Sequence, residues 1–370
     1  MTRNRRGAIC LEIYGRHTWY WGLEVFNSSP ERRATRPGAA ADPRGVGVLG
    51  RSGLGVRLIN MVIHDVGTAL FESQPSGLEI YGLLAYNNGW QGPDRSHGPG
   101  LYMRNRAGFP AKTIEDSVVF QNFRQGLQGY GTGPNVFSRF RVEGNAFFNN
   151  GIGRDGFHRN LMFGNRSPGH DDNVFRHNVT YYPPGFSSSA GSNRLGAAPE
   201  TCARLTLENN IFAHGPGRGA VEVEGCSELR LRGNLFHGRA EIDGAEMAAS
   251  YPENKYPEQP TGQLARLRVN RYEPRRALLT VLNWSEAPDV EVELCGWSPP
   301  EGAMISVRSA QDPFGRELRS WFHGEPLELP MTGWGAARPI GLETQPLPPT
   351  YPRFGVFLLS WDAPSGGLSE

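Results

Sequence analysis

Residues 142–148 read Val-Glu-Gly-Asn-Ala-Phe-Phe, and residues 207–212 read Leu-Glu-Asn-Asn-Ile-Phe. Both segments place apolar residues on alternate positions before a polar corner, and a short strand-favouring run follows the corner. Such recurrence predicts a solenoid in which each repeat is one coil. Aligning the repeats gives one column of corner residues: Leu23, Met61, Leu83, Ser117, Asn145, Asn178, Asn210 and Asn234.

Two further columns accompany the corner column. Three positions before it the residues are mostly apolar: Tyr20, Leu58, Ile80, Ile114, Val142, Phe175, Leu207 and Leu231. Three positions after it they are largely aromatic: Phe26, His64, Tyr86, Phe120, Phe148, Tyr181, Ala213 and His237. Successive corners are 22 to 38 residues apart, which fits one short coil plus loops of varying length. The pattern therefore predicts an all-β protein built on a parallel β-helix, right-handed by the usual chirality of strand crossovers.

Composition limits the possible classes. The chain has 370 residues, 38% hydrophobic content, 48 Gly and 29 Pro, which is typical of a turn-rich globular protein. A net charge of +1 offers no global field for nucleic acid, and no apolar run is long enough for a membrane span. We expect a monomer that binds neither nucleic acid nor a membrane.

The start of the chain and its cysteines bear on localisation. The N-terminus is basic but lacks the apolar stretch of a secretion signal, and it leads directly into a strand. We therefore expect upstream coils and an export signal to be missing, and the protein to be secreted or on the cell surface. Cys202 and Cys226 precede matching strands one 24-residue coil apart. Because stacked strands lie about 4.8 Å apart, we expect a disulfide if the protein is exported and two stacked thiols if it is not.

The chain divides into two domains. The repeat pattern ends near residue 244, residues 245–263 form a Pro-rich linker, and residues 264–370 contain short strands at regular spacing. Regular short strands predict a small antiparallel β-sandwich. Trp297, Trp321 and Trp334 are the residues through which that sandwich would bind sugar, the alternative being that it only caps the solenoid.

Several segments resemble a known superfamily. Residues 97–105 (His-Gly-Pro-Gly-Leu-Tyr-Met-Arg-Asn), 112–116 (Lys-Thr-Ile-Glu-Asp) and 126–131 (Gly-Leu-Gln-Gly-Tyr-Gly) resemble bacterial right-handed parallel β-helix repeat proteins of the pectate-lyase-like superfamily. Residues 270–277 and 308–315 are similar to the sandwich that often follows such helices. The resemblance implies the architecture, but the superfamily includes lyases, hydrolases, epimerases, phage tailspikes and non-catalytic surface proteins.

The loops between the repeats hold most of the candidate chemistry. Residues 90–105 supply an acid (Asp94), a base (His97) and guanidinium groups at Arg95 and Arg104. These roles match β-elimination, in which a base removes a proton beside a carboxylate that a cation neutralises. Trp90, Tyr102, Arg124 and Tyr130 are the expected substrate-binding residues. The alternative is that Asp94 and His97 only satisfy the backbone of their own loop.

Lys112 is anomalous, because the alignment places it in a column that is otherwise apolar, at Val56, Leu78, Phe140 and Leu205. A buried lysine has a lowered pKa and makes a catalytic base. The alternative is that its stem packs at the strand start while the ammonium group reaches water.

Carboxylates provide the competing mechanism, which is glycoside hydrolysis by an acid/base pair. The candidates for this pair are Glu115, Asp116, Asp155, Asp171 and Asp172, with His158 and His170 near these acids. Asp171 and Asp172 are weak candidates for a Ca²⁺ site. Each of these acids also has a simple explanation as a turn residue.

The sequence thus favours an enzyme that cleaves or modifies an acidic polysaccharide in a groove along the β-helix, with β-elimination ahead of hydrolysis. The alternative from another class is a non-catalytic glycan-binding or cell-surface protein. No fingerprint for a nucleotide, a serine nucleophile or a zinc protease is present in the sequence.

Overall fold

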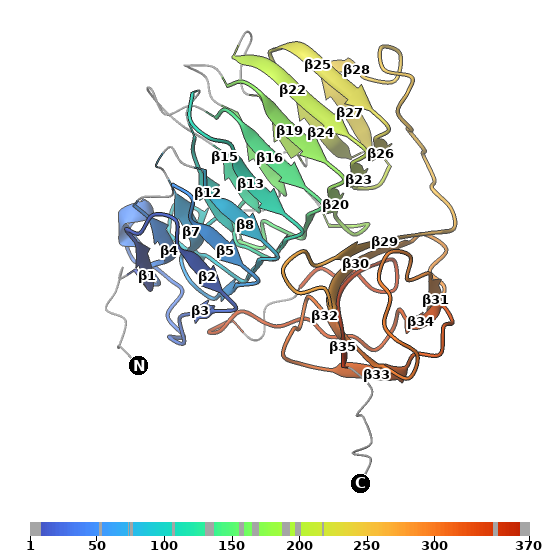
Figure 1. The fold of residues 1–370 in the computed structure, drawn as a ribbon. Coiled ribbons are helices and arrows are strands. Elements are labelled where there is room, and N and C mark those ends of the chain that lie inside the picture. Colours follow the sequence, from blue (N-terminus) through green and yellow to red (C-terminus); the bar gives the residue numbers. More distant parts are fainter. Residues whose placement is uncertain are drawn as a thin grey trace. The chain divides into compact units, whose positions relative to one another are not determined.

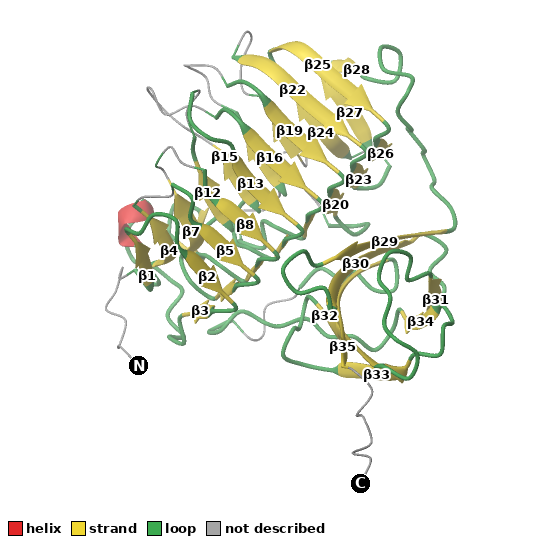
Figure 2. Cartoon of the chain, in the orientation of Figure 1, coloured by secondary structure: helices red, strands yellow, loops and turns green. Residues whose placement is uncertain are grey.

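The computed structural model describes residues 9–51, 54–72, 74, 77–105, 108–129, 137–154, 159–164, 170–186, 193–196, 201–216, 218–342 and 347–362. These residues separate into two compact units. The first comprises residues 1–259 and 338–348, and the second comprises residues 260–337 and 349–370. Strands make up nearly all of the regular structure, with one short 3₁₀ turn, η1 (Ala39–Ala41) (Figure 2).

The first unit is a parallel β-helix with three sheets, which confirms the predicted fold class (Figure 1). Sheet A contains, in order, β1 (Leu11–Ile13), β4 (Val46–Gly50), β7 (Thr68–Glu72), β12 (Leu101–Met103), β15 (Leu127–Gly129), β18 (Leu161–Phe163), β21 (Asn193–Leu195), β24 (Gly219–Val223), β27 (Arg239–Ile242) and β28 (Ala245–Glu246). Sheet B contains β2 (Trp19–Trp21), β5 (Arg57–Ile59), β8 (Glu79–Tyr81), β13 (Lys112–Glu115), β16 (Phe140–Glu143), β19 (Asn173–Arg176), β22 (Cys202–Glu208) and β25 (Cys226–Arg232).

Sheet C completes each coil. It contains β3 (Glu24–Phe26), β6 (Val62–His64), β9 (Leu84–Tyr86), β14 (Val118–Phe120), β17 (Ala146–Phe148), β20 (Val179–Tyr181), β23 (Ile211–Ala213) and β26 (Leu235–His237). A separate hairpin, β10 (Trp90–Gln91) with β11 (Ser96–His97), lies in the connection from β9 to β12. The aligned columns are confirmed strand by strand, as Ile114 pairs with Val142 and Phe120 with Phe148.

The corners between sheets B and C explain why the sequence repeats there. Each corner has two residues, and the first has a positive φ, as at Gly144 (70°), His177 (54°) and Asn209 (54°). Glycine and asparagine adopt this conformation most readily. The second residue forms the predicted ladder: Asn145 Nδ2 donates to Asn178 Oδ1 (2.9 Å) and to the carbonyl of Ile114 (2.8 Å). The side chain is buried but fully hydrogen-bonded, so the ladder fixes the register of the coils.

The ladder extends beyond the predicted repeats. Asn234 Nδ2 donates to Asn254 Oδ1 at 2.8 Å, so Asn254 caps the column. Met247 is buried in the same core, and the ring of Tyr256 stacks on Phe236. Residues 245–259 of the predicted Pro-rich linker belong to the first unit, because side chains such as Met247 and Tyr256 cover the apolar end of the last coil.

A second asparagine ladder lies between sheets C and A and was not predicted. Asn88 donates to Asn122, Asn122 to Asn150, and Asn150 to Asn160, at 2.8 to 2.9 Å. The predicted disulfide is present, joining Cys202 and Cys226 across β22 and β25.

The second unit consists of antiparallel sheets. A five-stranded sheet has the order β29 (Gln263–Val269), β30 (Arg276–Asn283), β35 (Phe354–Asp362), β32 (Met304–Ser309) and β33 (Glu317–Trp321). A two-stranded sheet pairs β31 (Asp289–Val292) with β34 (Leu327–Pro330). Both sheets contribute to one hydrophobic cluster, which includes Val281, Val307, Val290 and Leu329.

Residues 338–348 leave the second unit and belong to the first, which divides the predicted 264–370 domain. The amide of Ile340 donates to Asp65 Oδ1 (2.8 Å), and its carbonyl accepts from Arg32 Nε (2.6 Å). Arg32 and Asp65 form a buried ion pair, and His64 contacts Asp65 at 2.7 Å. The segment therefore binds to the buried Arg32–Asp65 ion pair of the solenoid. Among the described residues, no helix is long and apolar enough to cross a membrane.

Candidate functional site

Sheet A is the sheet with variable loops on both sides. The corners between sheets B and C always have two residues, whereas the connections into and out of sheet A vary in length from coil to coil. One outward column runs along this sheet, and its members alternate with buried core residues. It consists of Phe71, Tyr102, Gln128, Met162, Arg194, Glu222 and Glu241, which are paired strand to strand. These side chains are half-buried and form the candidate binding face.

The hairpin β10–β11 brings four predicted residues together beside this sheet. The turn is closed by the amide of Gly92, which donates to the carbonyl of Arg95 (2.9 Å). His97 Nε2 lies 3.2 Å from Asp94 Oδ1, and the imidazole stacks on Trp90 with ring centroids 4.1 Å apart. The hairpin thus arranges an acid, an imidazole and an aromatic ring within one turn.

The imidazole of His97 is held neutral at neutral pH. Burial lowers its pKa below the ordinary value, the carboxylate of Asp94 opposes this, and the charges of Arg95 and Arg124 lower the pKa further. Arg124 therefore lies within electrostatic reach of His97, as the interpretation of these residues as one cluster requires. Only 6% of His97 is exposed, so its ring serves the hairpin at least as much as it could serve a substrate.

Tyr102 and Arg104 also lie together. Arg104 donates to the hydroxyl of Tyr102 (3.2 Å), and its guanidinium carbon is 5.5 Å from the centre of that ring. The ring also stacks on Phe71, with ring centroids 5.0 Å apart. This group adds aromatic rings and a guanidinium group to the candidate binding face.

Lys112 does not reach the surface. The alignment placed it correctly in the apolar column, opposite Phe140, but its side chain is fully buried and forms an ion pair with buried Glu72. The amine also donates to the backbone carbonyls of Gln74 and Arg104. Burial lowers its pKa well below the ordinary value. A lysine inside the solenoid cannot touch a polymer outside it, so both explanations given above, catalytic base and surface-reaching stem, are replaced by an internal ion pair.

Asp116 has a conformational explanation. It is the first residue of a corner between sheets B and C, with φ of 47°, and it accepts a hydrogen bond from the hydroxyl of Tyr81 (2.8 Å). This corner is on the edge of sheet B away from sheet A, so Asp116 does not join the candidate binding face.

Asp171 and Asp172 are occupied by arginines. Arg204 contacts both oxygens of Asp171 at 2.8 Å, and Arg141 contacts both oxygens of Asp172 at 2.8 and 3.0 Å. Guanidinium groups hold the positions that a cation would take, so these residues do not fit the predicted Ca²⁺ site. The described ranges contain no group of three or more acidic, histidine or cysteine residues arranged to hold a metal. Asp155, His158 and Tyr130 lie outside the residues that the structure describes.

A pair of carboxyl groups that sequence reasoning missed lies on the binding face. Glu222 and Glu224 are two residues apart at the end of β24 and project to the same outer side. Glu224 forms an ion pair with Arg194 of the preceding coil. Burial and the neighbouring Glu224 raise the pKa of Glu222 above its ordinary value. Although burial opposes it, hydrogen bonding to Arg194 and Glu222 lowers the pKa of Glu224.

Both pKa shifts also include the charge of Arg159, which is itself mostly buried. The signal in the sequence was the alternation Val-Glu-Val-Glu over residues 221–224. In a strand of a solenoid this alternation turns two acids outward side by side.

Comparison with known proteins identifies no family for this chain. No family model matches the chain, and no curated protein matches it. A similar solved structure is the crystal structure of tailspike protein gp49 from Acinetobacter baumannii bacteriophage Fri1, described as a capsular polysaccharide depolymerase. The match has 9% identity and a TM-score of 0.30, and covers 87% of this chain and 79% of the tailspike chain. At that level of similarity the comparison supports no argument about activity.

Proposed function

We propose that this protein is a polysaccharide-cleaving enzyme that binds its substrate along the outer face of sheet A and uses Glu222 and Glu224 for proton transfer. One observation carries the proposal: two outward carboxyl groups are hydrogen-bonded to each other, Glu224 forms an ion pair with Arg194, and their pKa values are shifted in opposite directions. Such separation within a pair is how a site assigns one carboxyl as acid and the other as base or nucleophile.

The roles follow from the shifts. Glu222, whose pKa is raised by burial and by Glu224, is assigned as the acid that donates a proton to the oxygen of the glycosidic bond that breaks. Glu224, ionised beside Arg194, faces the positive charge that develops on the sugar ring. Two residues along one strand span about 6.6 Å between Cα atoms. The side-chain hydrogen bond between Glu222 and Glu224 holds their carboxyl groups closer together than the Cα atoms, and we propose hydrolysis by this hydrogen-bonded pair.

The binding face favours a long and acidic substrate. Arg194 and Arg159 lie beside the carboxyl pair, and Arg104 lies beside Tyr102 on the same sheet. Guanidinium groups bind carboxylate and sulfate well because they donate two parallel hydrogen bonds. Tyr102 and Glu222 are four strands apart, or roughly 19 Å at the usual strand spacing. A polymer is the substrate class that would contact both.

A second candidate reaction is β-elimination at His97. The specific observation in its favour is a neutral imidazole that contacts Asp94, with the charges of Arg95 and Arg124 close by. In this mechanism His97 removes the proton beside a uronate carboxylate, and an arginine neutralises that carboxylate.

The test is a panel of acidic and neutral polysaccharides, assayed for new reducing ends and for the ultraviolet absorbance of unsaturated products. We expect reducing ends without unsaturation, and a loss of roughly 10²–10⁴-fold in turnover for Glu222→Gln. Glu228→Gln, which changes an exposed acid on sheet B outside the binding face, is the matched control and should retain activity. Unsaturated products lost in His97→Ala but retained in Glu222→Gln would establish the second reaction instead. Binding without any product would leave a non-catalytic glycan-binding protein.

The Cys202–Cys226 disulfide supports an extracellular location as part of the same proposal. Structural disulfides persist in oxidising compartments and are rare in reducing ones. Fractionation of the native host followed by thiol labelling would test it, and an intracellular protein with four reactive thiols would contradict it.

A further inference from the structure

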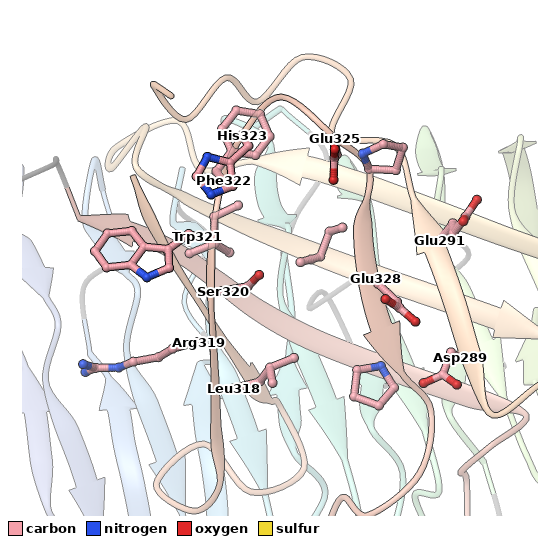
Figure 3. Close-up of a pocket in the computed structure, with 14 residues that line it drawn as sticks. Asp289, Glu291, Leu318, Arg319, Ser320, Trp321, Phe322, His323, Glu325 and Glu328 are labelled. Carbon is pink, nitrogen blue, oxygen red and sulfur yellow. The ribbon is translucent and has the colours of Figure 1, made fainter. Parts of the chain in front are cut away.

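The second unit contains a cavity that the proposed reaction does not use. Its volume is about 560 Å³, and it opens between β33 and the two-stranded sheet (Figure 3). This lies within the roughly 300–1,000 Å³ that is usual for sites of small ligands. The cavity is therefore large enough for a sugar unit.

Polar and apolar groups share the walls. Ser320 and Leu318 lie on the side of β33 that faces Glu328 and Asp289 (Figure 3). Leu327 adds apolar surface to the lining. A sugar ring has the matching character, since its C–H face packs on apolar surface while its hydroxyls donate hydrogen bonds. Carboxylates accept such bonds strongly because the acceptor is ionised.

The charge of the lining excludes acidic ligands. Four carboxylates line the cavity, from Asp289, Glu291, Glu325 and Glu328, against one guanidinium, that of Arg319. Arg319 is already hydrogen-bonded to Glu317 at 2.9 Å. In the described part of the chain, none of the four carboxylates forms an ion pair. An anionic sugar would be repelled, whereas hydroxyl or ammonium donors would be attracted.

An added peptide strand fits this site poorly, although β33 and β34 each have a free edge in their sheets. Pro326 and Pro330 stand along β34 or next to it, and Glu325 and Glu328 add charge there. Prolines and charged side chains are the features that prevent an edge strand from pairing with another chain.

We propose that this cavity is a binding site for a neutral or amino-sugar unit of a glycan, separate from the acidic chain bound by the first unit. Trp321, which is 58% exposed, lies at the edge of the cavity with its indole on the side of β33 away from Glu328 (Figure 3), where an adjoining sugar unit would contact it. Trp297 is buried with its indole N–H donating to the carbonyl of Pro274, and Trp334 donates to Pro330. Of the three tryptophans, Trp321 is thus the one available to a ligand. The proposal does not depend on catalysis by Glu222.

The experiment uses the full chain and calorimetric titration with short oligosaccharides of three kinds: neutral, amino and uronic acid. Neutral or amino-sugar oligomers should bind, and Glu328→Gln should weaken that binding roughly ten- to hundred-fold. Glu301→Gln, an exposed acid outside the cavity, is the matched control and should bind like the wild type.

A second pair of variants tests sugar binding at the cavity without changing a carboxylate. Trp321→Ala should weaken binding of oligomers more than of single sugars, whereas Phe314→Ala, which removes another exposed aromatic ring, should not. The unfolding curve of each variant checks that the unit remains folded. The proposal would be overturned if only uronic acid oligomers bound, or if no neutral or amino sugar bound. It would also be overturned if Glu328→Gln and Trp321→Ala bound the oligomers as tightly as the wild type does.

Discussion

Replacing Lys112 with methionine should destabilise the solenoid strongly, because the change leaves the buried carboxyl group of Glu72 without its partner. Both side chains are essentially inaccessible, at 0% and 1% exposure. Removing one member of a buried ion pair costs about 3–5 kcal/mol. Total stabilities of about 5–15 kcal/mol are usual, so the variant should lose a large fraction of its stability. The equilibrium constant for unfolding should rise by two to nearly four powers of ten.

The double variant distinguishes the pair from simple packing. Glu72→Leu with Lys112→Met replaces both charges by apolar groups of similar size, and such replacements are often neutral or stabilising. We therefore expect the double variant to be markedly more stable than Lys112→Met alone. Glu79→Gln breaks the more exposed pair with Arg57 and serves as the control, with an expected cost of about 0–1 kcal/mol.

The assay is denaturant unfolding followed by circular dichroism, with the transition of the first unit analysed separately because two units need not unfold together. The reasoning is refuted if Lys112→Met unfolds within about 1 kcal/mol of the wild type, which is the cost of an exposed pair. It is also refuted if the double variant is less stable than the single one.

Three further outcomes are expected. Asn178→Ala should cost about 1–3 kcal/mol in denaturant unfolding, because it leaves the buried amide of Asn145 and the buried carbonyl of Val142, both in the preceding coil, without their partner; an effect near zero would mean that the ladder does not fix the register. Replacing both Cys202 and Cys226 with serine should lower the free energy of unfolding by about 3 kcal/mol, as expected for a loop of this length. If the oxidised and the reduced wild-type protein had the same free energy of unfolding, this prediction would be contradicted. Burial is the largest single effect on the pKa of His64 and lowers it, but the hydrogen bonds to Asp65 and Glu24 together raise the pKa above its ordinary value. Its contribution to stability should thus be fully present below about pH 6.5 and be lost as the pH rises through the higher folded pKa, a dependence that His64→Phe should lack.

The sequence predicted those parts of the fold that have a constant period. Corners between sheets B and C always contain two residues, so Asn145, Asn178 and Asn210 could be aligned by inspection. The second ladder follows connections of changing length, and Asn150 and Asn160 are only 10 residues apart. No fixed spacing reveals such a ladder.

The same physical reason explains the errors at the candidate site. The alignment placed Lys112 in the core column, but its partner Glu72 comes from sheet A, whose phase relative to sheet B varies with each loop. Glu222 lies in sheet A and Glu224 directly follows the same strand, and the strands of this sheet have no constant spacing along the sequence. By contrast, Asp94 and His97 were found correctly as neighbours because a short hairpin connects them.

The docking of residues 338–348 onto the solenoid has a practical consequence for dissecting this protein. A fragment ending near residue 260 would lose the backbone of Ile340, and Asp65 would be deprived of the amide that it accepts from. The carbonyl that receives Arg32 would be absent too. A truncated fragment would therefore lack contacts that stabilise the half it retains. Loss of activity in such a fragment would reflect the loss of these contacts and would not show that the deleted half contains catalytic residues.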